Sequence, residues 1–187
     1  MAVTWWGEDL QPYDHPYNDT AKNERAVELA AAFRWLQNRD PSAGLEVGNV
    51  LSHYRPAQHR IIDRWEEAEG VENLDVFDVR GEYPWVVAIS TLEHVRLDEP
   101  EQDQWGAVRA LFHLRTLVQE GGGLFVTVPL GWNMRLDDYL LRWPGCTRAC
   151  TFVREGGGWV QTPELTWMPY GRTTIWADSV WIGEWEG

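Results

Sequence analysis

Carboxylate, amide and imidazole side chains follow four apolar segments of this chain, each at the point where a strand is expected to end. They are Glu46-x-Gly48-Asn49 after the first segment, Asp63 after the second, Asp75 after the third, and Ser90-Thr91-x-Glu93-His94 after the fourth. The carboxyl ends of parallel strands meet at one edge of an open sheet, where such sheets bind ligands. We therefore expect these side chains to form one site for a nucleotide-shaped cofactor.

Three of these residues suit a nucleoside. Gly48 lets the backbone approach a ligand without a Cβ in the way, and turns of this kind commonly need a positive φ. The Asp63 carboxylate can accept hydrogen bonds from both hydroxyls of a ribose, and Asp75 can accept one from an exocyclic amine. The sequence thus predicts a ribose contact and a base contact on neighbouring strands.

The fourth set offers a general base beside the reactive end of the cofactor. His94 is the best candidate because an unperturbed imidazole titrates near neutral pH. Glu93 either orients His94 or binds the substrate. A packing or helix-capping role is the alternative for His94, and His53, which follows the first turn, is a second candidate base for which we expect a structural role.

The acceptor is expected over the fourth and fifth strands. Trp132 can stack on a ring face while Asn133 hydrogen-bonds hydroxyl groups, although a loop filled by its own Trp is the alternative. Tyr17, Asn23 and Arg25 are expected to close over the cofactor as a lid. Arg25 could instead pair with Glu28 on the helix surface.

No metal site is expected. Asp137 and Asp138 could bind a divalent ion, but a solvated acid pair at a helix start is the favoured interpretation. Cys146 and Cys150 have no matching Cys or His pair that would complete a zinc site, so they are expected to be free thiols.

Composition limits the function classes. The chain has 187 residues and a net charge of −13, so a nucleic-acid partner is not expected. No run of about 18 apolar residues is present, so no segment is expected to span a membrane and no membrane partner is expected. Residues 1–6 lack the organisation of a signal peptide. We therefore expect a cytoplasmic protein with a full core.

The periodicity predicts alternating helices and strands. A helix capped by residues 18–20 is expected to end at 40–42, a second to begin at 98–100 and end at the glycines 121–123, and a short third to span 136–143. Strands are expected at 45–47, 60–63, 73–78, 85–90, 124–128, 150–155, 159–162 and 179–186. This pattern predicts an α/β fold: a Rossmann-like three-layer sandwich with a mostly parallel central sheet and an antiparallel C-terminal hairpin.

One domain, residues 1–187, is expected. Its parts would be an N-terminal lid and helix (1–40), a cofactor-binding core (43–130), and the acceptor side with the C-terminal strands (131–187).

Several segments resemble class I S-adenosylmethionine-dependent methyltransferases. The matching segments are 17–28 (YNDTAKNERAVE), 45–54 (LEVGNVLSHY), 61–78 (IIDRWEEAEGVENLDVFD), 89–95 (ISTLEHV) and 124–133 (LFVTVPLGWN). More narrowly, the chain resembles a small bacterial and archaeal group whose members are often met among glycan-related genes. Val50 and Ser52 stand where glycines are usual, as in the narrower group, and Pro84 stands where an Asp usually precedes the fourth strand.

The resemblance implies S-adenosylmethionine as cofactor and S-adenosylhomocysteine as product. The implied cofactor-binding residues are Glu46, Gly48, Asn49 and Val50 on the methionine and ribose side, Asp63 with Arg64 at the ribose hydroxyls, Asp75 with Val76 at the adenine edge, and Ser90 and Thr91 beside the sulfonium. Glu93 and His94 would face the acceptor. Independently of the resemblance, the expected acceptor-binding residues are Tyr17, Arg25, Trp132 and Asn133.

The function that follows is O-methylation of a sugar, glycan or small hydroxylated acceptor. A non-catalytic binding or assembly module that kept the fold is the alternative. An NAD-type dehydrogenase is a third reading, but the missing glycines and the absence of a Tyr-x-x-x-Lys pair count against it. A homodimer is possible, since the Trp-rich segment 179–186 could cover its own sheet or a neighbour's.

Overall fold

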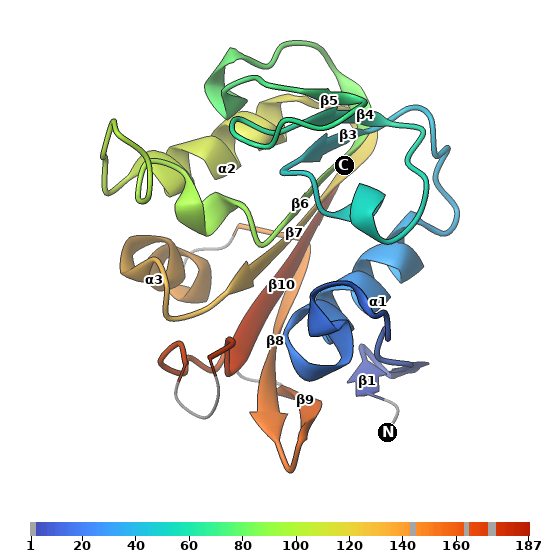
Figure 1. Ribbon diagram of the computed structural model, residues 1–187, viewed down its shortest axis with the longest axis vertical. Coiled ribbons are helices and arrows are strands. Elements are labelled where there is room, and N and C mark those ends of the chain that lie inside the picture. The colour runs from blue at the N-terminus through green and yellow to red at the C-terminus, as the bar shows by residue number, and fades with distance from the viewer. Residues whose placement is uncertain (1–2, 143–144, 163–164, 172–174) are drawn as a thin grey trace.

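An eight-stranded sheet runs through the protein, in the order β5-β4-β3-β6-β7-β10-β8-β9. The structure is a computed structural model that describes residues 3–142, 145–162, 165–171 and 175–187 (Figure 1). The strands are β3 (Leu45–Val47), β4 (Arg60–Ile62), β5 (Val71–Glu72), β6 (Tyr83–Ile89), β7 (Val118–Pro129), β8 (Arg148–Glu155), β9 (Gly158–Thr162) and β10 (Ser179–Glu186).

The first five strands of this sheet along the chain are parallel, and the last three bring in antiparallel pairing. β3 pairs in parallel with β4 and β6, β4 with β5, and β6 with β7. β10 lies antiparallel between β7 and β8, and β8 and β9 form an antiparallel hairpin. The predicted mostly parallel sheet with an antiparallel C-terminal hairpin is confirmed.

Helices cover both faces of the sheet (Figure 1). α1 (Arg25–Leu36) lies on one face, and α2 (Gly106–Thr116) and α3 (Met134–Arg142) lie on the other. Side chains alternate between the faces along β7: Phe125 packs with the α1 cluster, whereas Leu124 and Val126 pack with the α2 and α3 cluster. The three-layer sandwich is therefore confirmed. Among the described residues, the helices are too short or too polar to span a bilayer.

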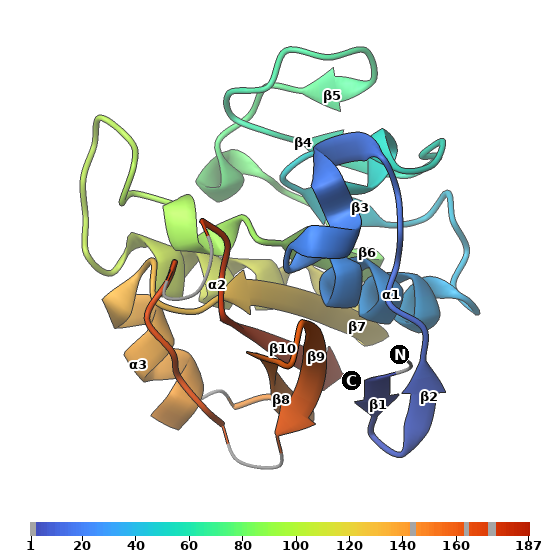
Figure 2. The same ribbon diagram turned by 60° about the horizontal axis from the view of Figure 1, so that its bottom comes forward.

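A small hairpin precedes this sandwich. β1 (Val3–Trp5) pairs with β2 (Glu8–Leu10), and Figure 2 shows the hairpin below α1, on the side of β8 and β9. The turn between its strands places Trp6 at φ 47° and Gly7 at φ 84°.

The N-terminal helix begins later than predicted. Asn18 and Asp19 do not cap it, because both adopt left-handed backbone angles inside a 3₁₀ turn, η1 (Tyr17–Lys22). The side chain of Asn23 instead accepts a 2.9 Å hydrogen bond from the Arg25 backbone N–H, where α1 starts.

The predicted third strand, 73–78, is wrong over its whole length. β5 ends at Glu72, and the segment that follows contains a 3₁₀ turn, η3 (Val76–Asp78). The Asp75 side chain accepts a 3.0 Å hydrogen bond from the Phe77 N–H, which favours a turn over an extended chain.

The helix expected from 98–100 begins instead at Gly106. Asp98 and Glu99 use their carboxylates in side-chain pairs rather than at a helix N-terminus. Helical spacing predicts Trp105 and Phe112 on the buried side of this helix, but both are about half exposed.

The predicted break at 121–123 is also wrong, because these glycines lie inside β7. A Cβ on Gly122 would lie 2.7 Å from the Pro84 carbonyl oxygen, so the glycine allows a close approach between two strands. The short third helix is confirmed as α3, and residue 143 of its predicted span lies outside the described residues.

Candidate functional site

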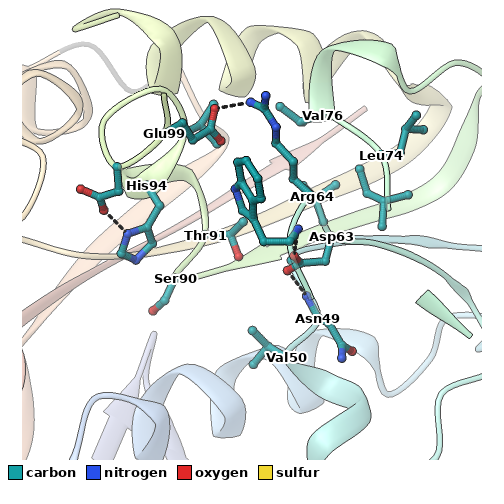
Figure 3. Close-up of a pocket in the computed structure, with 16 residues that line it drawn as sticks. Asn49, Val50, Asp63, Arg64, Leu74, Val76, Ser90, Thr91, His94 and Glu99 are labelled. Carbon is teal, nitrogen blue, oxygen red and sulfur yellow. Dashed lines mark hydrogen bonds and ion pairs between the residues drawn. The ribbon is translucent and has the colours of Figure 1, made fainter. Parts of the chain in front are cut away.

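A cavity of about 350 Å³ opens at the carboxyl ends of β3, β4 and β6. It brings together nine of the residues that the sequence singled out: Gly48, Asn49, Val50, Asp63, Arg64, Val76, Ser90, Thr91 and His94. Figure 3 shows Ser90 and His94 on one side of the cavity and Leu74 and Val76 on the other. The expected convergence on one site is thus present for the ends of β3, β4 and β6, and the segment after β5 contributes Leu74 and Val76.

The turn after β3 depends on Gly48. Its φ is +83°, and a Cβ at this position would lie 2.1 Å from the Thr91 Oγ1. The Gly48 N–H donates a 2.8 Å hydrogen bond to the Ile62 carbonyl oxygen. Gly48 therefore lets the first turn lie against both the second strand and the turn after β6.

Glu46 supports this turn from beneath and does not line the cavity. Its buried carboxylate accepts hydrogen bonds from the N–H groups of Val50 (2.8 Å) and Leu51 (2.7 Å) through Oε1. Its Oε2 lies 2.7 Å from the His59 Nε2. Glu46 thus shapes the turn rather than touching a ligand, which corrects the role expected for it.

Asp63 joins the first and second turns. Its Oδ1 accepts hydrogen bonds of 2.8 Å from the N–H groups of both Trp65 and Glu66. Among the described residues, its Oδ2 accepts only a 3.2 Å bond from the Asn49 N–H, shown in Figure 3. A carboxylate oxygen carries two lone pairs, so Oδ2 keeps acceptor capacity at the cavity wall.

Asp75 forms ion pairs with two arginines and does not line the cavity. Its Oδ2 lies 2.6 Å from the Arg96 Nη2 and 3.1 Å from the Arg64 Nη1. Burial opposes ionisation, but the Phe77 N–H and these guanidinium groups hold the pKa of Asp75 below its usual value. The expected contact of Asp75 with an exocyclic amine is therefore not prepared in this geometry.

Glu99 lines the cavity where Asp75 does not. Its Oε2 lies 2.6 Å from the Arg64 Nη1 (Figure 3) and also pairs with Arg96. The sequence did not identify Glu99 because the Asp-Glu-Pro run at 98–100 is typical of a helix start, and Arg96 pairs with Asp75 from 21 residues away, which no local pattern indicates. The ion pairs fix the cavity wall on the side of Arg64.

His94 forms a dyad with Asp98 at the other end of the cavity. Its Nδ1 lies 2.6 Å from the Asp98 Oδ2, which also accepts a 2.9 Å hydrogen bond from the Trp132 Nε1. Burial opposes ionisation, but these two hydrogen bonds lower the pKa of Asp98. Since an ionised carboxylate only accepts, the neutral imidazole carries its proton on Nδ1 and leaves Nε2 as the basic nitrogen.

Asp98 was not among the predicted site residues, although its i, i+4 spacing from His94 was a usable signal. Trp132 does not line the cavity, but its ring centroid lies 5.6 Å from that of His94, and the residue is 43% exposed. Trp132 therefore lies beside the dyad, where a ring-shaped acceptor could contact both.

Asn133 and Glu93 are buried behind the dyad. Asn133 donates a 2.9 Å hydrogen bond from Nδ2 to the Glu93 carbonyl oxygen and accepts one of 3.1 Å from the Leu136 N–H. Both of its polar groups are thus engaged in the fold, so the expected contact of Asn133 with acceptor hydroxyls is not prepared. Glu93 is 2% exposed and does not line the cavity.

Arg25 and Tyr17 also take positions outside the cavity lining. The Arg25 Nη1 lies 2.5 Å from the Glu28 Oε2, the pairing that was the alternative interpretation, although Glu28 is fully buried rather than on the surface. The Tyr17 ring stacks on His53 with centroids 4.6 Å apart and planes at 12°. His53 in turn lies 3.1 Å from a Glu66 carboxylate oxygen.

Asp137 and Asp138 separate in the structure. Asp138 is exposed and pairs with Arg142 on α3. Asp137 is buried, which corrects the expectation of a solvated acid pair, and its Oδ2 accepts hydrogen bonds from the Gly131 N–H and the Trp167 Nε1. Burial raises the pKa of Asp137 to about 6. No group of three or more His, Cys, Asp or Glu side chains within the described ranges is placed to hold a metal ion.

No protein-family model matches the sequence, and no curated protein matches it. Solved structures do. The N-methyltransferase NodS from Bradyrhizobium japonicum WM9, in complex with S-adenosyl-L-homocysteine, superposes with a TM-score of 0.54 at 10% identity, covering 88% of this chain and 87% of that one. The sugar N-methyltransferase KedS8 from Streptoalloteichus sp. ATCC 53650 gives a TM-score of 0.45 at 14% identity, with 98% and 97% covered.

The likeness to NodS extends over most of both chains and concerns the backbone, since one residue in ten is shared. The chain therefore has the Rossmann-like α/β fold of class I S-adenosylmethionine-dependent methyltransferases.

Proposed function

We propose that this protein is an S-adenosylmethionine-dependent methyltransferase that acts on a hydroxyl group of a small acceptor, a sugar or glycan among them. One observation carries the proposal: a single cavity joins the Gly48 turn and the Asp63 carboxylate to the His94–Asp98 dyad. The Gly48 turn and Asp63 suit a nucleoside, and the His94–Asp98 dyad suits removal of a proton from an acceptor.

The cavity fits the cofactor in size and chemistry. About 350 Å³ lies within the usual range of ligand sites. Asp63 Oδ2 keeps acceptor capacity for ribose hydroxyls, and Leu74 and Val76 supply apolar contacts for a planar base. Glu99 has one carboxylate oxygen outside the ion pairs and could accept from an exocyclic amine there. When bound, S-adenosylmethionine supplies an electrophilic methyl group.

The dyad supplies the base. With Nδ1 bonded to Asp98, the His94 Nε2 would accept the proton that leaves the acceptor hydroxyl. Asp98 holds the ring in that tautomer and stabilises the imidazolium that forms, and the Trp132 N–H holds Asp98 in turn. The exposed Trp132 ring beside His94 suits a ring-shaped acceptor such as a sugar.

Isothermal titration with S-adenosylhomocysteine tests the cofactor part of the proposal. We expect binding to the wild type and at least about tenfold weaker binding to Asp63→Asn. Asparagine keeps an oxygen for the neighbouring N–H groups, so the turn survives better than in an alanine variant. Asp138→Asn, on the exposed face of α3, is the matched control. Absence of binding to the wild type would favour a non-catalytic module with the same fold.

A further inference from the structure

Three carboxyl groups are buried behind the acceptor end of the cavity, together with one guanidinium group. They belong to Glu24, Glu28 and Glu93, which are 8%, 0% and 2% exposed, and to Arg25. We call these four residues the acidic cluster. Burying carboxyl groups in excess over cations costs free energy unless another partner compensates them.

Glu28 is the satisfied member of the acidic cluster. Its Oε2 pairs with Arg25 at 2.5 Å, and its Oε1 accepts hydrogen bonds from the Ser90 Oγ (2.5 Å) and the Thr127 Oγ1 (2.7 Å). Ser90 also lines the cavity. The acidic cluster therefore lies one side chain away from the ligand space, and its single guanidinium is already committed to Glu28.

Glu93 is the unsatisfied member. Its Oε2 is buried and has no hydrogen-bond partner among the described residues, and its Oε1 lies 3.7 Å from the His94 Nε2. Burial raises the pKa of Glu93 well above its usual value, and Glu28 and Glu24 add to this rise while Arg25 opposes it. A carboxyl group without a partner thus lies next to the basic nitrogen of the dyad.

Two aromatic rings lie beside His94, the residue that follows Glu93 along the chain. The Trp132 centroid is 5.6 Å from that of His94 and 5.2 Å from that of Tyr170. Burial and the carboxyl groups of Glu24, Glu93 and Glu28 raise the pKa of Tyr170 to about 12, so this phenol faces the acidic cluster. Aromatic faces beside carboxyl groups are a common arrangement for binding organic cations.

We propose that the acceptor carries an ammonium group, which binds over the rings of Trp132 and Tyr170, beside His94 and its buried neighbour Glu93. This inference rests on the proposed methyltransferase function and narrows its acceptor to an amino-substituted hydroxyl compound, such as an amino sugar. A neutral acceptor leaves Glu93 without a partner, and an anionic one meets an excess of carboxyl groups. An ammonium group over these rings supplies the missing positive charge to the buried Glu93 carboxyl group.

The test uses three sugars that differ at one substituent: D-glucosamine, N-acetyl-D-glucosamine and D-glucose. Each is titrated calorimetrically into the wild type at neutral pH, with and without saturating S-adenosylhomocysteine. We expect D-glucosamine to bind at least about tenfold more tightly than the two neutral sugars. Equal binding of the three, or no binding of D-glucosamine, would overturn the ammonium inference.

Failure of the proposed function is seen separately, because it appears as no binding of S-adenosylhomocysteine itself. In that case the titrations without it still compare the charged sugar with the neutral ones. A preference for D-glucosamine would then support the ammonium site alone, and its absence would reject that site as well.

The Glu93→Gln variant assigns the site. Glutamine keeps the shape of the carboxyl group, so we expect S-adenosylhomocysteine to bind as in the wild type while the preference for D-glucosamine disappears.

A cation beside Glu93 should also ionise it, so D-glucosamine binding to the wild type should release a proton that Glu93→Gln does not release. Titrations in two buffers of different ionisation enthalpy measure that proton and do not require the variant to fold. Glu120→Gln, exposed in β7, is the control. An unchanged preference in Glu93→Gln would contradict the assignment.

Discussion

Gly48 and Thr91 approach so closely that a Cβ on the glycine would lie 2.1 Å from the threonine Oγ1. This contact joins the turn after β3 to the turn after β6, and both turns line the cavity. Val50, at φ −113°, needs no glycine, and Ser52 has no positive φ. The incomplete glycine series therefore still contains the one glycine that the geometry requires.

Gly48→Ala should destabilise the protein by about 2–4 kcal/mol, because it adds backbone strain at φ +83° to a steric clash. Urea unfolding measures this change. In the double variant with Thr91→Ala, the clash is reduced and the strain persists, so part of the loss should be recovered. If the two substitutions are simply additive, the clash with Thr91 does not determine the cost.

Asp98→Asn should reduce methyl transfer by about 10²–10⁴-fold, because the asparagine no longer selects the His94 tautomer with a basic Nε2. Transfer is measured with labelled S-adenosylmethionine and a panel of amino and neutral sugars. His94→Gln should cause a loss of similar size, and the two substitutions combined should cost little more than either alone. A multiplicative loss in the double variant would show that the two residues do not act as a dyad.

Arg25→Met should destabilise the protein by about 3–5 kcal/mol, because it leaves the carboxylate of Glu28 buried without its cation. Adding Glu28→Gln removes that charge, so the double variant should be more stable than Arg25→Met alone. Urea unfolding of both variants checks this order. A double variant that is less stable than Arg25→Met would mean that Glu28 is held by Ser90 and Thr127 without need of Arg25.

The sequence located most of the site because strand ends follow local patterns. Short apolar segments identified β3, β4 and β6, and in a parallel sheet their carboxyl ends necessarily meet. Asp63, Gly48 and His94 therefore came together at the cavity as predicted. What local patterns do not contain is the direction that each side chain takes once distant segments pack.

Asp75 and Glu46 illustrate that limit. Each is a carboxylate near the end of a strand, but Asp75 is engaged by Arg96, 21 residues away, and Glu46 by His59, 13 residues away. These partners depend on tertiary packing. Asp98 was missed for the opposite reason, since a helix-start pattern outweighed the spacing that pairs it with His94.

The contribution of Asp137 to the stability of the protein should fall as the pH rises from about 4 to about 6. Burial raises its pKa to about 6, against 3.8 for an ordinary Asp. In this range the folded state keeps a proton that the unfolded state loses, so the free energy of unfolding decreases. Above about pH 6 the decrease is complete. The difference between the two pKa values corresponds to about 3 kcal/mol in the free energy of unfolding.

Asp137→Asn should remove this contribution, because asparagine does not ionise and its oxygen can still accept from the Gly131 and Trp167 N–H groups. Urea unfolding of variant and wild type over pH 4–8 isolates the effect as a difference, since the other titrating groups are shared. The free energy of unfolding of Asp137→Asn should increase relative to that of the wild type as the pH rises. Asp138→Asn, which alters an exposed ion pair, should show the same pH dependence as the wild type. A difference between Asp137→Asn and wild type that stays constant with pH would mean that the buried carboxyl group is ionised throughout, and that its two N–H donors outweigh its burial.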